Sequence, residues 1–238
     1  MIKLEKTEVM GWEPAIRGMR NPMNSWDRMD SEECAHRCYT HCSDDECPML
    51  DETGHCNLRG RNKFIVGPND HELMMKLVKG GPVHAKFRRM ITVYVDITAP
   101  LYWWKEFDTY KVGAVANSCS TMHKIHAKEF TLEDFSHEHL MNLEHDGELC
   151  RDWLDTLECL IDDLNVARKF YLETKDKSYW WQMIQLLPSS YNQKRTVELN
   201  YEVLAGIYIS RKNHKLDEWR EFCKWIEELP YSEIIIGG

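Results

Sequence analysis

The sequence predicts an α+β protein that is rich in helices and contains a small sheet. Three observations support this fold class: a β-branched segment in the first half of the chain, apolar residues at helical spacing through much of the second half, and an ordinary globular composition with 43% hydrophobic and 29% charged residues. The chain has 238 residues, enough for one large domain or two small ones. We expect a single domain over residues 1–238.

Residues 1–97 are predicted to contain two strands and two helices. Glycine and proline residues between positions 1 and 26 divide the apolar runs into a strand, a turn and a helix. After a polar stretch, Asn69 or Asp70 can cap a helix that the Gly80-Gly81 pair ends. Residues 90–97 are rich in β-branched side chains and alternate in part, which predicts a strand.

The rest of the chain is predicted to be mainly helical. Apolar residues recur at helical spacing from Leu149 to Leu172, so we expect one long helix there. Thr131 is expected to open another helix, because Thr131-Leu132-Glu133-Asp134 is close to a capping box. The other helices expected from apolar spacing and proline stops cover residues 102–107, 179–187, 196–209 and 216–229.

The charge and hydropathy of the chain exclude several classes of partner. Thirty lysines and arginines against 39 acidic residues give a net charge of −9, without the basic excess typical of a duplex-binding domain. The longest apolar runs are shorter than the roughly 20 residues that span a bilayer, and the start lacks the apolar stretch of a signal peptide. We expect a soluble cytoplasmic protein without bulk nucleic acid or membrane as partner, although an acidic protein can still bind a small anion.

Cysteine is concentrated in a polar region between residues 27 and 67, which we interpret as a cysteine-rich insertion. The total of nine cysteines is odd, which argues against a fully paired disulfide framework. The spacings suit pairs of zinc ligands, although no Cys-x2-Cys pair is present. Reduced free thiols and an iron–sulfur cluster are the alternatives to a structural zinc site. The candidate metal ligands are Cys34, Cys38, Cys42, Cys47 and Cys56.

Common nucleotide-binding and hydrolase motifs are absent: the sequence has no Gly-x-Gly-x-x-Gly, P-loop, His-Glu-x-x-His or Gly-x-Ser-x-Gly. Residues 106–124 are instead rich in small hydroxyl side chains and include Lys111, His123 and Lys124. Such a stretch can wrap an anion with N–H groups, hydroxyls and nearby positive charge. A capped helix start in a polar loop is the alternative.

The chain resembles the flavin-dependent thymidylate synthases in the spacing of several residues. That family has Ala-Pro after a strand, an Arg-His-Arg triplet, and then Ser-x-Asn-Glu-x-Ser-x-Arg-Tyr. Here Ala99-Pro100 ends the predicted strand, and residues 109–111 lie where the triplet falls. With one inserted residue, Asn117 matches the Asn of the motif and Ser120 its second Ser.

The second half of the chain resembles the same family without any gap. The family has Leu-Pro, an Asn twelve residues after the Pro, and an Arg eleven residues after that Asn. Leu187-Pro188, Asn200 and Arg211 reproduce these intervals. Near the N-terminus, Val9-Met10-Gly11 is similar to the family's opening strand and turn. The resemblance covers roughly residues 1–26 and 68–229 and leaves the cysteine-rich insertion outside it.

Several cations of the family's pattern are missing. Thr109, Tyr110 and Lys111 stand where the family has two arginines and a histidine that hold flavin and nucleotide. Ser118 replaces the Glu of the motif, and Met122 replaces an Arg that meets the substrate phosphate. The other replacements are Ile184 and Glu202 in place of arginines and Gly206 in place of a flavin-contacting Asn; candidate substitutes for the lost cations are His84, Lys86, Arg88, Arg89, His123, Lys124 and His126. A solvated pair at the strand start is the alternative for Arg88 and Arg89.

The resemblance implies a fold, an activity and a set of cofactors. It implies a small antiparallel sheet packed with several long helices, and a homotetramer with ligand sites between subunits. The implied activity is flavin-dependent one-carbon transfer to a pyrimidine deoxynucleotide such as dUMP, with FAD as cofactor and NADPH and methylenetetrahydrofolate as co-substrates. A non-catalytic nucleotide- or flavin-binding or interaction protein with the same fold, and a relative that modifies another pyrimidine nucleotide, are the alternatives.

The resemblance also implies roles for individual residues. Arg211 would contact the uracil ring and help polarise it for attack at the carbon that gains the methyl group. The implied catalytic residues are Arg211 and Ser120; the implied FAD-binding residues are His84, Tyr110, Lys111 and Asn200; and the implied nucleotide-binding residues are Asn117, Ser118, Cys119, Ser120, His123, Lys124 and Arg211.

Overall fold

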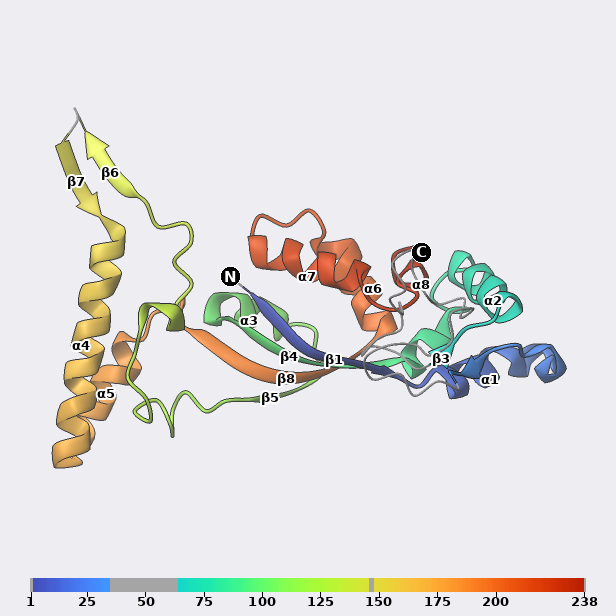
Figure 1. Cartoon of the computed structure of the whole chain (residues 1–238), viewed down its shortest axis with the longest axis horizontal. Coiled ribbons are helices and arrows are strands. Elements are labelled where there is room, and N and C mark those ends of the chain that lie inside the picture. The colour runs from blue at the N-terminus through green and yellow to red at the C-terminus, as the bar shows by residue number, and fades with distance from the viewer. Residues whose placement is uncertain (1, 35–63, 146–147, 238) are drawn as a thin grey trace. The chain divides into compact units, whose positions relative to one another are not determined.

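The computed structural model describes residues 2–34, 64–145 and 148–237 of the chain (Figure 1). The fold is α+β, as predicted, and its main sheet has four antiparallel strands in the order β1-β4-β8-β5. Two smaller antiparallel pairs are formed by β2 with β3 and by β6 with β7. The strands are β1 (Lys3–Met10), β2 (Glu32–Glu33), β3 (Phe64–Ile65), β4 (Thr92–Pro100), β5 (Val115–Ser118), β6 (Asn142–His145), β7 (Glu148–Asp152) and β8 (Asn192–Asn200).

Helices make up most of the other regular structure. Within the part of the chain that the structure describes, none of them has both the length and the apolar character needed to cross a bilayer. The α-helices are α1 (Trp12–Arg20), α2 (Pro68–Lys79), α3 (Leu101–Phe107), α4 (Trp153–Thr174), α5 (Lys177–Leu186), α6 (Tyr201–Arg211), α7 (Asp217–Glu227) and α8 (Glu233–Ile236), and the short 3-10 helices are η1 (Asn21–Met23), η2 (Trp26–Arg28), η3 (Lys86–Met90) and η4 (Leu132–Asp134).

The chain folds into two compact units. The first consists of Met1–Lys3, Ile97–Thr109 and Asn117–Arg195. The second consists of Leu4–Asp96, Tyr110–Ala116 and Thr196–Gly238. Each unit contains part of every strand of the main sheet.

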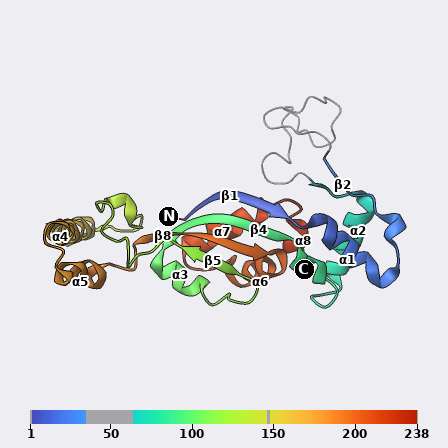
Figure 2. The ribbon, with the colours of Figure 1, turned by 90° about the horizontal axis from the view of Figure 1, so that it is seen from below.

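The core of the first unit is built on the α4–α5 pair. The two helices lie side by side in both ribbon views (Figure 1, Figure 2). The apolar residues of α4 recur at helical spacing, which places them on one face of the helix toward α5 and the preceding segment. The buried residues of this core are Ile125, Phe130, Phe135, Leu157, Ile161, Leu164, Ala167 and Met183.

The core of the second unit is formed by α1, α2, α6, α7 and α8 together with β4. Trp12 of α1 packs edge-on against Tyr201 at the start of α6, with ring centroids 5.5 Å apart. The chain turns from β1 into α1 at Gly11, which has a φ of 92°. A Cβ at that position would lie 2.1 Å from the carbonyl oxygen of Met90, so both the backbone conformation and the close approach require glycine.

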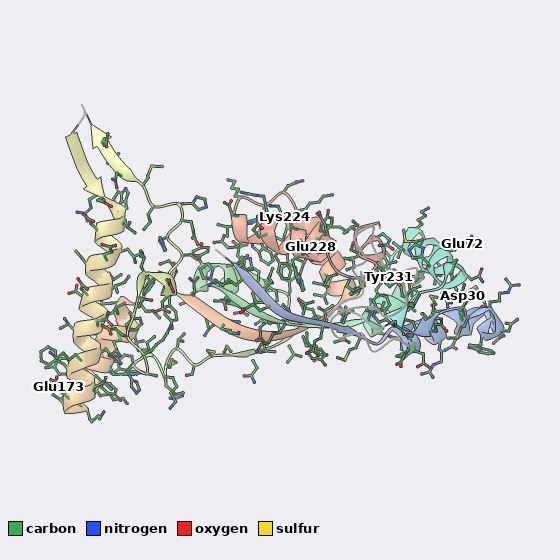
Figure 3. All side chains as sticks on the ribbon, viewed as in Figure 1. Asp30, Glu72, Glu173, Lys224, Glu228 and Tyr231 are labelled. Carbon is green, nitrogen blue, oxygen red and sulfur yellow. The ribbon has the colours of Figure 1, made fainter. Side chains whose placement is uncertain are left out.

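Two carboxylates fasten the ends of the cysteine-rich insertion to α2. Asp30 accepts hydrogen bonds from the backbone N–H groups of Asn69 and Asp70, at the start of the helix. In return, Asp70 accepts the backbone N–H groups of Asp30 and Ser31, each at 3.0 Å. Figure 3 shows Asp30 close to α2 and its exposed residue Glu72. Beyond this clamp β2 pairs with β3, which sets Glu33 opposite Phe64.

We expect residues 34–63 of the insertion to be removable, because Glu33 and Phe64 already lie opposite each other in the β2–β3 pair. A variant in which Asn-Gly replaces residues 34–63 would join Glu33 to Phe64 through a two-residue hairpin turn. The Asp30–Asp70 clamp is left intact, and a shorter loop costs less closure entropy. The melting temperature of this variant should therefore stay within a few degrees of the wild-type value in a circular-dichroism melt.

The Gly67→Ala variant is the control, since it disturbs the clamp and leaves the insertion in place. Its Cβ would lie 2.3 Å from both Cγ and the carbonyl oxygen of Asp30, so we expect a clear loss of stability. A deletion variant that unfolds while Gly67→Ala melts normally would show that the insertion is an integral part of the unit.

Two predicted helices begin in the wrong place. Residues 196–200 are part of strand β8, not of a helix, and α6 starts only after Asn200 caps it. The long helix begins at Trp153 instead of residue 149, because the Asp152 side chain accepts the N–H groups that begin α4 and the residues before it form β7. In both segments a strand runs directly into a helix, so no loop marks the boundary between them.

Two predicted helix starts are also corrected. Thr131 forms the expected capping box with Asp134, but the helix that it opens is only the three-residue η4. Neither Asn69 nor Asp70 caps α2, because the helix begins at Pro68 and its N-cap residue is Gly67. Asp70 lies within the first turn. Its carboxylate is buried and binds Arg20 and the segment that leads into the insertion.

Candidate functional site

Arg211 lies in an aromatic cluster at the C-terminal end of α6. Its Nε donates a hydrogen bond to the hydroxyl of Tyr110 at 2.8 Å. The guanidinium carbon lies 4.7 Å from the ring centroid of Trp219 and 5.7 Å from that of Tyr110, distances typical of cation–π contacts. Trp219, on α7, is fully buried and packs edge-on against Tyr110. We call Tyr110, Arg211 and Trp219 the Arg211 cluster.

The ends of α6 explain why Arg211 is held there. The Asn200 side chain accepts a hydrogen bond from the backbone N–H of Val203 at 3.0 Å and so fixes the start of the helix. Arg211 is the last residue of α6, where the negative end of the helix dipole favours a cation. Tyr110 reaches it from a segment about a hundred residues earlier in the sequence.

The loop after Tyr110 lies against the start of the same helix. Gly113 has a φ of 81°, and a Cβ there would lie 2.9 Å from Val203 Cγ2 and 3.0 Å from Asn200 Nδ2. Lys111 is exposed in this loop. The structure therefore brings three of the four implied FAD-binding residues, Tyr110, Lys111 and Asn200, to α6.

The fourth implied FAD-binding residue, His84, lies in the turn after α2. Its side chain is exposed, and its ring faces Gly80 at the end of that helix. His84 belongs to the second unit, as the Arg211 cluster does, but it is not part of the cluster.

A pocket in the first unit lies beside the implied nucleotide-binding segment. Its volume is about 370 Å³. The end of β5 and the start of β8 meet there, because Cys119 donates its backbone N–H to the Lys194 carbonyl and accepts a hydrogen bond from Gln193 Nε2, both at 2.9 Å. We call it the Cys119 pocket; it is lined by Lys3, Thr98, Cys119, Ser120, Thr121, Lys128, Thr131, Glu133, Asp134, Tyr191, Asn192, Gln193 and Lys194.

The electrostatics of the Cys119 pocket are mixed. Lys128 forms an ion pair with Asp134. Burial, and then the nearby acidic groups Asp134 and Cys119, raise the pKa of the Tyr191 hydroxyl above its ordinary value of 10.0, so this hydroxyl stays protonated at neutral pH. The lining therefore combines neutral donors with charges of both signs: Lys3, Lys128 and Lys194 against Glu133 and Asp134.

The implied nucleotide-binding residues occupy a single exposed stretch. Asn117 and Ser118 lie in β5, where all four residues are exposed. The hydroxyl of Ser120 accepts the backbone N–H of His123 at 2.9 Å, which closes the turn after the strand. His123 and Lys124 are exposed. These residues lie in the first unit, whereas Arg211 lies in the second.

Arg88 is not available as a substitute cation. Its side chain is 5% exposed, and its Nε lies 2.9 Å from Glu202 Oε2. Its Nη1 donates to the backbone carbonyl of Ile234 at 3.2 Å. The alternative of a solvated arginine pair is therefore wrong for Arg88, although Arg89 is exposed. Glu202 neutralises Arg88 inside the second unit.

Sequence reasoning missed two residues that surround the candidate sites. Trp219 falls within a predicted helix, and its spacing marks it as a core residue without revealing its contact with Arg211. Arg195 stacks on Trp104 at 4.1 Å, donates to Asp108 at 2.7 Å and holds the Gln193 side chain at 2.9 Å. The predicted helix start at residue 196 concealed the strand on which Arg195 lies, because residues 196–200 belong to β8.

The candidate metal site falls mainly outside the described residues. Cys38, Cys42, Cys47 and Cys56 lie in the segment 35–63, of which the structure gives no description, and Cys34 lies just before it. Elsewhere in the described ranges, no group of three or more His, Cys, Asp or Glu side chains is arranged to hold a metal ion. The zinc site stays a prediction.

Comparison with known proteins gives matches at the level of structure. No family model matches the sequence, and no curated protein matches it. The structure is similar to thymidylate synthase X (ThyX) from Helicobacter pylori with FAD and dUMP, at a TM-score of 0.60 and 14% identity over 98% of this chain and 96% of that one. It is similar to a second Helicobacter pylori ThyX structure complexed with FAD and dUMP, at a TM-score of 0.58 and 13% identity over 97% and 96% of the two chains.

A third solved structure is similar over a smaller part of the chain. It is a UMP/dUMP methylase, PolB from Streptomyces cacaoi, bound with 5-Br UMP. The TM-score is 0.47 and the identity 14%, over 72% of this chain and 82% of that one.

Proposed function

We propose that this chain, which has the fold of the flavin-dependent thymidylate synthases, binds FAD and a pyrimidine deoxynucleotide such as dUMP and transfers a one-carbon unit to the pyrimidine ring. The observation that supports the proposal most strongly is the placement of Arg211. Arg211 stands at the sequence position where the resemblance implies an arginine that contacts uracil, and its guanidinium contacts Tyr110 and Trp219. The fold is also similar, over nearly the full chain, to a structure solved with FAD and dUMP. This similarity supports the proposal for Arg211, because function depends on the site that a fold carries.

In this proposal Arg211 binds and polarises the pyrimidine. A guanidinium remains charged at any physiological pH and donates hydrogen bonds in a planar fork that matches carbonyl oxygens. A fixed cation next to a ring carbonyl stabilises the negative charge of the enolate form, in which the neighbouring carbon is nucleophilic. Because the guanidinium is already positioned before the ligand arrives, little reorganisation is needed.

The nucleotide's sugar and phosphate are assigned to the stretch from Asn117 to Lys124. Its exposed hydroxyl, amide and backbone N–H groups can bind phosphate oxygens, and His123 and Lys124 add donors and positive charge. Ser120, the second residue that the resemblance implies in catalysis, has its hydroxyl oriented by the N–H of His123.

The donor set beside α6 fits a flavin. Lys111 supplies an exposed cation for the pyrophosphate, and the Asn200 amide lies next to the Gly113 loop. His84 supplies a further ring donor in the same unit. When bound, FAD would supply the redox and one-carbon relay chemistry that no side chain of the protein supplies. We further propose NADPH and methylenetetrahydrofolate as co-substrates and a homotetramer as the working form.

A second candidate function is supported by the state of the internal arginines. Arg88 forms an ion pair with Glu202, and Arg195 forms one with Asp108. Neither replaces the cations that the family's pattern has and this chain lacks, and each charged hydrogen bond contributes about 1.5–3 kcal/mol. This observation favours a protein that keeps the fold and the ligand preference but not the catalysis.

Titration calorimetry with dUMP, UMP, dCMP, dTMP and FAD tests the proposal on the full-length protein. We expect saturable binding of dUMP and FAD, and a ligand at 100 times its dissociation constant should add about 2.7 kcal/mol of stability in a thermal-shift experiment. Binding of dCMP or UMP in preference to dUMP would indicate another pyrimidine substrate. A protein that binds neither FAD nor any of the nucleotides would contradict the proposal.

A further inference from the structure

We infer that Tyr110 is a positioning residue for Arg211: its hydroxyl, together with the face of Trp219, sets the plane of the guanidinium that meets the pyrimidine. This inference rests on the proposed function of the same site. The resemblance implies a flavin contact for Tyr110, whereas the geometry assigns its hydroxyl to Arg211.

The three side chains form a mutually supporting arrangement. Trp219 is 0% exposed, so it forms the buried side of the cluster and offers no surface to a ligand. Tyr110 packs edge-on against Trp219, with ring centroids 5.9 Å apart. Arg211 lies over both rings and donates Nε–H to the Tyr110 hydroxyl at 2.8 Å. The arrangement depends on long-range contacts between α6, α7 and the segment before Gly113.

Fixing Nε matters because of how arginine recognises a planar ligand. The side chain has several rotatable bonds, and its fork gives directional recognition only when its plane is fixed. A hydrogen bond at Nε and an aromatic face together set this plane, and so set the direction of the whole guanidinium fork. Loss of the Tyr110 hydroxyl should therefore loosen the guanidinium while retaining its charge.

The Tyr110→Phe variant removes the hydroxyl and keeps the ring that packs on Trp219. We expect the dissociation constant for dUMP to rise about tenfold, the effect of losing a hydrogen bond to a charged group that preorganises the site. The dissociation constant for FAD should stay unchanged. Titration calorimetry measures both, and a thermal melt of the same samples reports on folding.

Tyr208→Phe is the matched control. Tyr208 also lies on α6, and its hydroxyl donates to the Glu227 carboxylate on α7 at 2.7 Å. The same chemical change is therefore made on the same helix, at a residue with no part in the Arg211 cluster. Tyr208→Phe should leave both dissociation constants unchanged.

A double-mutant cycle separates positioning from a general structural role. In an Arg211→Ala background, Tyr110→Phe should cause no further loss of dUMP affinity, because the residue it positions is gone. A wild-type protein that binds no pyrimidine nucleotide would overturn the proposed function. A wild-type protein that binds dUMP while Tyr110→Phe binds it equally well, or loses FAD affinity instead, would overturn the positioning role alone.

Discussion

The Arg211→Ala protein is expected to lose about 100-fold in kcat/KM for dUMP, the upper range for a hydrogen bond to a charged group. The loss should appear in both binding and turnover, since the guanidinium would contact the ring in the ground state and stabilise the charge that develops later. Initial rates measured with saturating FAD and co-substrates give the ratio. Arg211→Lys, which keeps the charge but not the planar fork, should recover only part of the activity.

Lys212→Ala is the control for this experiment. Lys212 is the next residue along the chain, is exposed, and its ammonium lies 5.6 Å from the ring of Tyr208. The Lys212→Ala substitution removes one positive charge at the residue next to Arg211 and leaves the Arg211 cluster unaltered. Equal losses of kcat/KM in Arg211→Ala and Lys212→Ala would show that the effect comes from surface charge in general and not from contacts of Arg211 with the pyrimidine.

The Asp70→Ala protein is expected to lose about 3–5 kcal/mol of unfolding free energy, the usual cost of leaving one member of a buried ion pair without its partner. Asp70 is 0% exposed and Arg20 is 3% exposed, with Nε and Oδ1 2.6 Å apart. The substitution also removes the acceptor for the N–H groups of Asp30 and Ser31, which fasten the insertion to α2. Urea denaturation at neutral pH measures the loss.

The same carboxylate predicts a pH dependence of stability. Burial alone would raise the pKa of Asp70, but hydrogen bonds from Ser31 and Arg20 and the backbone of Asp30, with the charge of Arg20, outweigh it and hold the pKa below the ordinary 3.8. The stabilisation is therefore complete above about pH 4 to 5 and is lost as the pH falls through the lowered pKa. Asp70→Asn should remove this component of the acid transition.

Glu72→Ala serves as the control for both measurements. Glu72 is two residues further along α2 and is exposed (Figure 3). We expect its unfolding free energy to change by no more than about 0.5 kcal/mol, as is usual for surface substitutions. An Asp70→Ala protein as stable as Glu72→Ala would show that the buried pair and the clamp contribute little.

The helices that were predicted correctly have long, regular apolar faces. Leu157, Ile161 and Leu164 recur at helical spacing in α4 and are buried there. The failure at residues 196–200 has a physical cause, since β8 passes directly into α6 and both bury apolar residues. Asn200 supplied the signal for that boundary, because it is a preferred N-cap residue directly before an apolar helix.

The contacts that define the candidate site could not be predicted from local sequence. Tyr110 and Arg211 are 101 positions apart, and Trp219 lies on a different helix from Arg211. Arg88 also showed no local sign of burial, because the carboxylate that neutralises it comes from Glu202, over a hundred residues later. The spacing from Asn200 to Arg211 was readable from the sequence, whereas the residues that orient Arg211 depend on tertiary packing.

The measurement that tests the central claim most directly is product formation by the purified full-length protein. Incubation with dUMP, FAD, NADPH and methylenetetrahydrofolate, followed by mass spectrometry of the nucleotide, detects addition of a methyl group. We predict conversion of dUMP to dTMP that requires FAD and is strongly reduced in Arg211→Ala. Saturable binding of FAD and dUMP without any product would contradict the enzymatic claim and leave a ligand-binding protein with this fold.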